Sequence, residues 1–140
     1  MFSDLSVNEL HELYRLRTAI FVVEQECAYQ EVDEHDPKSI HALGFVDDEL
    51  VACARICPPK TVYQQPSIGR VAVHSRFRGK RYAHELFAAS LKRAQEEYPQ
   101  QAIKIQAQTY LESFHKSFGF TTVSEPYPDF GIMHVDMVLR

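Results

Sequence analysis

The stretch VAVHSRFRGKRYA, residues 71–83, decides the fold. It begins in an apolar segment that predicts a strand over Ser67–Val73, and it passes through a basic turn. It then enters the longest helical pattern of the chain, residues 81–98, which Pro99 ends. A further alternating segment at residues 102–107 predicts the next strand. A strand, a helix and a second strand in this order indicate a right-handed crossover between parallel strands, and hence a mixed α/β fold.

The basic turn indicates an anion-binding site. Arg or Lys occupies four of the six positions from 76 to 81, although the net charge of the chain is −4. The first turn of a helix already exposes unpaired N–H groups and the positive end of the helix dipole, so cations there disfavour the helix unless an anion binds. Gly79 lacks a Cβ and lets the backbone approach such an anion. A solvated basic turn is the alternative. The glycine spacing fits neither a P-loop nor a dinucleotide-binding fingerprint.

Helices and hairpins are expected in the rest of the chain. Ser6 and Glu9 have capping-box spacing at the start of an apolar stripe, and Thr109 and Glu112 have the same spacing near the other end. The segment at 22–39 has no periodicity and is rich in acidic residues, which predicts a long loop. The remaining elements are expected at residues 7–21 and 109–118 for helices, and at 41–46, 50–56, 120–124 and 132–139 for strands.

Composition limits the classes of protein to which the chain can belong. Its 140 residues, 45% of them apolar and 24% charged, predict a single globular domain over residues 1–140. The acidic net charge argues against nucleic-acid binding. No signal peptide or membrane-spanning run is recognisable, so we expect a cytoplasmic protein without membrane contact. The three cysteines, Cys27, Cys53 and Cys57, do not have the spacing of a disulfide framework, and Cys53 and Cys57 are expected to be small core residues rather than metal ligands.

The 71–83 stretch resembles the acyl-CoA-binding motif of the GNAT superfamily of N-acyltransferases, in which a strand leads into Arg/Gln-x-x-Gly-x-Gly/Ala and a helix. Residues 106–120, ending in Gly-Phe, resemble a later strand and helix of the family, and residues 16–25 and 129–134 resemble its ElaA-like branch. The resemblance covers nearly the whole chain. It implies an α/β fold of the α+β type: a GNAT-like splayed mixed β-sheet, flanked by helices, with a central strand–turn–helix cofactor motif.

The resemblance also implies ligands. Acetyl-CoA would be the acyl donor and a small-molecule or peptide amine the acceptor, with no metal, in a monomer or homodimer. Pantetheine would lie between the strands at 67–73 and 102–107, with the diphosphate on the basic turn. The residues expected to bind the cofactor are Val71, Val73, Arg78, Gly79, Lys80, Arg81, Tyr82, Ala83 and Gln108.

Two residues depart from the family pattern. Arg81 occupies a motif position that is usually Gly, so it either binds a phosphate through its side chain or weakens cofactor binding. His115 lies four residues before the Gly of Gly-Phe, where family members often have a Tyr that protonates the departing thiolate. An imidazolium can serve as that acid near neutral pH, so His115 is a candidate catalytic acid. A half-buried histidine without a chemical role is the alternative.

A base must take a proton from the acceptor, because alkylamines are mostly protonated at pH 7. Glu24 is the first candidate, and His134 and His41 are alternatives. The nearby acidic residues Asp33, Glu34 and Asp36 are expected either to attract a cationic substrate or to form a solvated charge run. The predicted function is N-acetyl transfer by direct attack of the amine on the thioester. The alternative is a sensor or interaction module that binds acyl-CoA without turnover.

Overall fold

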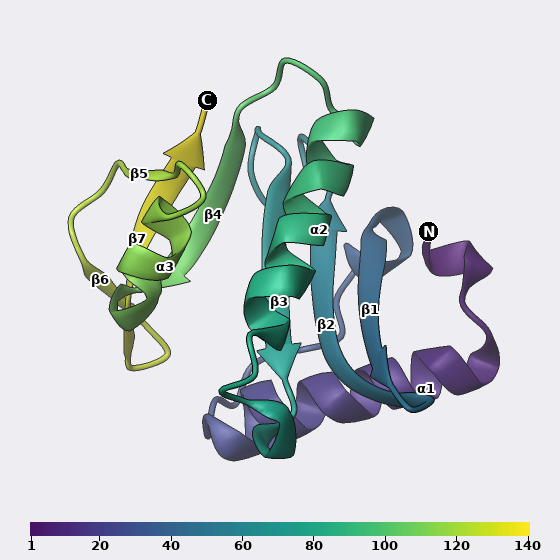
Figure 1. The fold of residues 1–140 in the computed structure, drawn as a ribbon. Helices are drawn as coiled ribbons and strands as arrows, with labels where there is room; N and C mark the ends of the chain where they lie inside the picture. Colours follow the sequence, from purple (N-terminus) through teal and green to yellow (C-terminus); the bar gives the residue numbers. More distant parts are fainter.

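The computed structural model describes residues 1–140 as a seven-stranded sheet in the order β1-β2-β3-β4-β7-β5, with β6 paired to β7 (Figure 1). The strands are β1 Ile40–Val46, β2 Glu49–Cys57, β3 Ser67–Val73, β4 Ile103–Gln108, β5 Thr121–Thr122, β6 Tyr127–Asp129 and β7 Ile132–Leu139. The α-helices are α1 Val7–Arg17, α2 Tyr82–Glu97 and α3 Glu112–Lys116. None of the helices combines the length and the apolar character that a membrane span requires.

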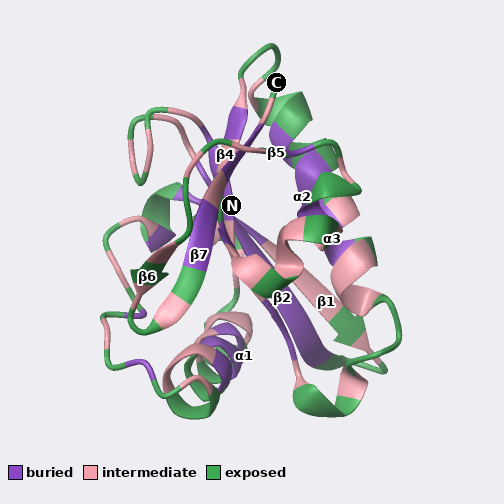
Figure 2. Ribbon diagram, turned by 90° about the vertical axis from the view of Figure 1, so that its left-hand side faces the viewer, coloured by how far each residue is buried: buried purple, intermediate pink, exposed green.

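Helices cover both faces of the sheet. Figures 1 and 2 show α1 on one face and α2 with α3 on the other. Leu13 and Leu16 of α1 are buried against Cys53 of β2, whereas Phe87 of α2 is buried against the opposite face beside Ile105 of β4. This arrangement confirms the predicted mixed α/β class with helices flanking the sheet.

The strands β3 and β4 form the one parallel pair, and they separate almost as soon as they meet. Their register includes a single residue pair, Ser67 with Lys104, and the N–H of Lys104 also donates to the carbonyl of Pro66 at 3.0 Å. Figure 1 shows the two strands diverging from this point. On its other edge β3 is bulged against β2, where Arg70 has φ of 51°. The edge of β3 that faces β4 therefore has free backbone groups beyond Ser67, as the predicted splayed sheet requires.

Local signals predicted some element ends and failed at others. The Ser6–Glu9 capping box is present, with both hydrogen bonds formed. The first helix changes after Arg17 into the π-helical segment Thr18–Glu24. The Thr109–Glu112 capping box was wrong: the short helix has no side-chain cap, and Glu112 instead accepts a hydrogen bond from Thr122. The strand β6 was not predicted, because its three residues contain Pro128 and carry no periodic pattern.

Candidate functional site

The space between the separated strands is a cleft of about 570 Å³. It is lined by β3 and β4, the end of the π-helical segment, the start of α2, α3 and the β6–β7 hairpin. The predicted site residues that line it are Glu24, Val71, Val73, Arg78, Ala83, Gln108 and His115, together with the alternative base His134. Gly79, Lys80, Arg81 and Tyr82 lie in the turn that leads from β3 into α2, outside the lining, and His41 also lies outside it.

The turn before α2 presents a row of unpaired backbone donors. The N–H groups of Gly79, Lys80 and Arg81 have no hydrogen-bond partner in the chain, and no side chain caps the helix that follows. The first N–H groups of any helix lack a partner within it, which adds those of Tyr82 and Ala83 to the row. Nothing lies within 4 Å of the place where a Cβ of Gly79 would be. These donors and the helix dipole favour an anion of the size of a diphosphate.

The conformation of Arg81 explains why a glycine is usual at this position. Its φ of 64° and ψ of 14° lie in the left-handed region, where a side chain costs about 1–2 kcal/mol. The left-handed residue turns the chain so that the row of N–H groups ends in the helix. Arg81 thus keeps the backbone geometry that the motif needs, at the expense of local strain.

We expect Arg81→Gly to raise the free energy of unfolding by about 0.5–1 kcal/mol, since Gly adopts this conformation without strain although it costs more entropy on folding. Urea denaturation measures the gain. The affinity for acetyl-CoA, measured by calorimetry, should change less than threefold if the Arg81 side chain does not bind a phosphate. Arg81→Ala, which removes the charge but keeps the strain, is the matched control. A gain in stability for Ala equal to that for Gly would contradict the conformational account.

An ion pair lies in the lining of the cleft. Arg78 contacts both carboxylate oxygens of Glu24, at 2.9 and 3.0 Å, and its Nε donates to the carbonyl of Val73 at 3.0 Å. The side chain of Arg78 is therefore turned back along β3, and both oxygens of Glu24 are occupied. This geometry does not favour Glu24 as the base that accepts a proton from the acceptor.

The surroundings of His115 do not favour an imidazolium acid. The ring lies among Phe87, Phe114 and Phe120, with centroids 4.9–6.2 Å apart, and its Nδ1 is buried without a partner. Burial lowers the pKa of His115 to about 4. With this pKa the side chain is largely neutral near pH 7, which does not favour His115 as an imidazolium acid, and its catalytic role stays a prediction. The sequence predicted the place of this residue in the cleft but not its aromatic surroundings.

A depressed pKa makes His115 a source of acid sensitivity. In the unfolded chain the imidazole binds a proton near pH 6.5, whereas in the folded protein it resists protonation down to about pH 4. The neutral His115 side chain therefore contributes its full share to the free energy of unfolding above pH 6.5. This share is lost as the pH falls toward 4, by about 3 kcal/mol in total. We expect His115→Phe to flatten the loss of unfolding free energy over this range in urea titrations. The exposed His11→Phe is the control, and parallel curves for wild type and His115→Phe would refute the assignment.

His134 lines the cleft and has one ring nitrogen without a hydrogen-bond partner. Its Nδ1 lies 2.7 Å from the carbonyl of Ile132, and because a carbonyl only accepts, the proton sits on Nδ1. Its Nε2 is left as a hydrogen-bond acceptor without a partner in the chain. His41, by contrast, directs Nε2 to the carbonyl of Asp36 at 2.9 Å, and burial lowers its pKa. Of the three candidate bases, His134 is the one that lines the cleft and has an acceptor atom without a partner in the chain.

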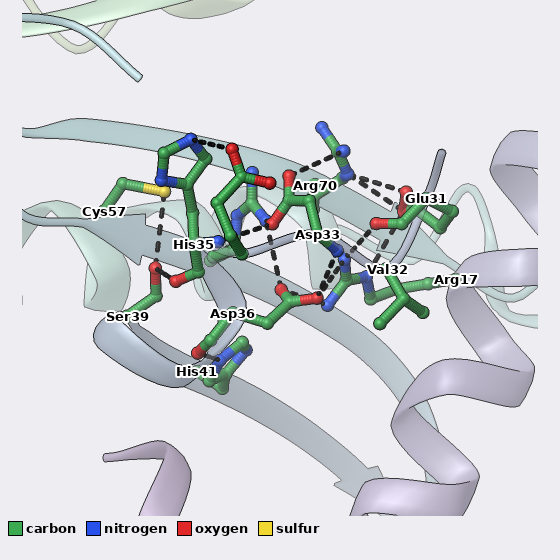
Figure 3. A network of polar contacts seen from close by, with 12 residues as sticks. Arg17, Glu31, Val32, Asp33, His35, Asp36, Ser39, His41, Cys57 and Arg70 are labelled. Carbon is green, nitrogen blue, oxygen red and sulfur yellow. Dashed lines mark hydrogen bonds and ion pairs between the residues drawn. The ribbon is translucent and has the colours of Figure 1, made fainter. Parts of the chain in front are cut away.

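In the acidic loop before β1, Asp33 and Asp36 are paired with arginines. They neither form a solvated charge run nor leave free negative charge to attract a cationic substrate, so both expectations for these two residues were wrong. Arg17, only 1% exposed, contacts Asp36 at 2.9 Å and Glu31 at 3.2 Å (Figure 3). Burial alone would raise the pKa of Asp36, but the hydrogen bonds and charges of Arg17 and then Arg55 outweigh it and hold that pKa below its usual value. Glu34, in contrast, is exposed, as a solvated residue would be.

The same network reaches the wall of the cleft. Arg55 contacts Asp33 at 2.7 Å and Asp36 at 3.0 Å, and Arg70 contacts Glu31 at 2.7 Å and lies 3.5 Å from Asp33. Three guanidinium groups thus alternate with three carboxylates, with no charge left over. Arg55 and Arg70 also line the cleft. The network ties the loop to the bulged strand β3 at the wall of the cleft. Sequence analysis missed it, because its members come from four separate segments.

Comparisons with known proteins bear on the same fold and site. A sequence model described as "Acetyltransferase (GNAT) domain" matches residues 6–140. The chain belongs to the GNAT acetyltransferase family. It is 40% identical to protein ElaA of Escherichia coli (strain K12) over 137 residues, which cover 96% of this chain and 90% of the relative. Membership confirms the predicted class of enzyme, an acyltransferase, and the ElaA-like branch.

Solved structures of GNAT proteins agree with the splayed sheet. The crystal structure of E. coli ElaA has a TM-score of 0.93 at 38% identity, and that of an acyl-CoA N-acyltransferase from Pseudomonas aeruginosa has 0.93 at 35% identity. Each match covers 99% of this chain and 95% of the other. An aminoglycoside 6'-N-acetyltransferase complexed with coenzyme A has a TM-score of 0.69 at 13% identity, over 95% of this chain and 91% of the other, which shows the shared fold alone.

Proposed function

We propose that this GNAT protein transfers the acetyl group of acetyl-CoA to a primary amine. The observation that supports this proposal most strongly is the row of unpaired N–H groups from Gly79 into α2, next to a cleft that opens between β3 and β4. A diphosphate accepts such donors, and the cleft offers room for pantetheine beside the free edge of β3. The side chain of Gln108 lines the cleft at the end of β4 and is proposed to contact the donor there.

The proposed reaction is direct attack of the amine on the thioester carbonyl. The acceptor ammonium gives one proton to Nε2 of His134, and the neutral amine forms the N–C bond. The C–S bond breaks to release the thiolate of CoA, and the nitrogen loses its second proton to water. Free N–H groups on the edge of β3, near Val71 and Val73, polarise the carbonyl. A thiol with a pKa near 8.5 is a fair leaving group, so the thiolate takes its proton from solvent without an acid at His115.

The carbonyl of Val73 is not part of this proposal, because it already accepts a hydrogen bond from Arg78. The acyl-CoA donor is expected to contact the free N–H groups on the edge of β3 that faces the cleft. The Glu24–Arg78 pair is expected to form the rim of the cleft. Because both oxygens of Glu24 contact Arg78, His134 replaces Glu24 as the proposed base. Glu24 is proposed to hold Arg78 in place.

Thiol release tests the proposal. The purified protein is incubated with acetyl-CoA and a panel of primary amines, free CoA is measured with a thiol reagent, and the acetylated amine is identified by mass spectrometry. We expect amine-dependent release with one product molecule per CoA. Binding of acetyl-CoA without release over the whole panel would instead favour a non-catalytic module, and the hydrolysis control without amine corrects for background.

A further inference from the structure

The charged residues of the cleft differ in whether they have an ion-pair partner within the chain. Its lining contains five residues that are charged at neutral pH: Glu24, Arg55, Arg70, Arg78 and Asp129. Four of them form ion pairs within the chain. Asp129 forms none; its Oδ2 accepts a hydrogen bond from Gln106 at 3.2 Å, and its Oδ1 has no partner. The cleft therefore has an anionic position that a ligand cation can occupy.

The position of Asp129 relates it to the proposed base. Asp129 pairs with Ile132 and Tyr127 pairs with His134 in the β6–β7 hairpin, so Asp129 and His134 are diagonal neighbours on one face. Such diagonal neighbours are roughly 7–8 Å apart, and their Cβ atoms somewhat less, within reach of long side chains. A single ammonium group between them can donate to the carboxylate and to Nε2 of His134. The pair can thus bind the amine in its protonated form and take one proton from it.

The wall next to Asp129 is aromatic. Phe130 is 59% exposed and packs against Tyr29 with ring centroids 5.2 Å apart. The ring of Tyr63 lies 4.4 Å from the ammonium of Lys104. Phe130, Tyr29 and Tyr63 all line the cleft. An exposed aromatic ring beside a carboxylate suits an amine that has an apolar body.

The arginines of the cleft do not offer a site for a carboxylate. Arg70 contacts both oxygens of Glu31 through Nε, at 2.9 and 2.7 Å, and Arg55 is bound to Asp33 and Asp36. Arg78 is held by both oxygens of Glu24. An acceptor that carries a carboxylate would compete with these carboxylates and would meet Asp129 as a like charge. We infer that the acceptors are primary amines with an apolar body and no carboxylate, and that Asp129 binds their ammonium group.

This inference rests on the proposed N-acyltransferase function, and a binding experiment separates the two. The probes are 2-phenylethylamine and L-phenylalanine, which share an aromatic body and differ by the carboxylate. Each is titrated by calorimetry into protein saturated with CoA, so that no turnover occurs. We expect 2-phenylethylamine to bind at least tenfold more tightly than L-phenylalanine. Asp129→Asn, which keeps an acceptor oxygen for Gln106, should weaken 2-phenylethylamine about tenfold and reduce the difference between the probes.

Asp136→Asn is the matched control. Asp136 lies on the same sheet face, but its charge is paired with Lys104 at 3.6 Å, so its loss should change the affinity for 2-phenylethylamine less than twofold. Urea denaturation verifies that both variants fold. Equal affinity for the two probes, no binding of either at millimolar concentration, or an Asp129→Asn variant that binds like wild type would overturn the inference. Asp129-dependent binding without acetylated product would support the inference and contradict the proposed function.

Discussion

Replacing His134 by Asn is expected to lower kcat for amine acetylation by about 10²–10³, with the Kd of acetyl-CoA changed less than threefold. The Asn amide nitrogen can take the place of Nδ1 and donate to the carbonyl of Ile132, which lies 2.7 Å from Nδ1 in the structure. The variant therefore keeps the local hydrogen bond and removes only the acceptor Nε2. Steady-state kinetics measures kcat, and calorimetry measures the Kd of acetyl-CoA.

The two other candidate bases provide the controls. Glu24→Gln should lower kcat less than tenfold, since both oxygens of Glu24 are already held by Arg78. His41→Gln, outside the cleft, should change kcat less than twofold. If the Glu24 variant lost more activity than the His134 variant, the base would have to be reassigned to Glu24.

Replacing Arg17 by Met is expected to lower the free energy of unfolding by about 3–5 kcal/mol. Met fills much of the space of the arginine stem but leaves Glu31 and Asp36 buried without their shared cation. When one partner of a buried ion pair is removed, the remaining charge stays buried and its desolvation is no longer offset by the attraction of the partner. Urea denaturation at pH 7 measures the loss, and Arg17→Lys serves as a second variant if the Met variant does not fold.

Arg93→Met provides the matched comparison. Arg93 forms a pair with Glu97 at 2.7 Å, but both side chains are at least 40% exposed. Exposed pairs contribute about 0.5 kcal/mol, so this loss should be several times smaller than that at Arg17. A loss at Arg17 no larger than that at Arg93 would show that the buried network does not support the fold.

The parts that sequence analysis predicted well are those that depend on local pattern. The stretch at 71–83 contains a strand, a basic turn and a helix start within thirteen residues, and the family resemblance starts from the same residues. The Ser6–Glu9 capping box depends on two residues three apart, and the structure contains it. Such signals are readable because the interacting groups are neighbours in the chain.

The parts that failed depend on contacts between distant segments. The acidic loop resembles a solvated run until Arg17, Arg55 and Arg70 are brought to it from α1, β2 and β3. The neutral state of His115 depends on Phe87 and Phe120, which lie 28 residues before it and five after it in the sequence. Asp129 and His134 are neighbours only because β6 pairs with β7, and no periodicity in the sequence predicts that pairing.

The central claim is that the N–H groups from Gly79 into α2 bind the diphosphate of an acyl-CoA, and a truncation series of the donor tests it most directly. Calorimetry compares acetyl-CoA, acetyl-dephospho-CoA, which keeps the diphosphate, and S-acetyl-4′-phosphopantetheine, which does not. We predict that the first two bind within about tenfold of each other and that the third binds about 100-fold more weakly, as expected for the loss of one or two charge-assisted hydrogen bonds. Equal affinity for all three donors, or no binding of acetyl-CoA at millimolar concentration, would contradict the claim.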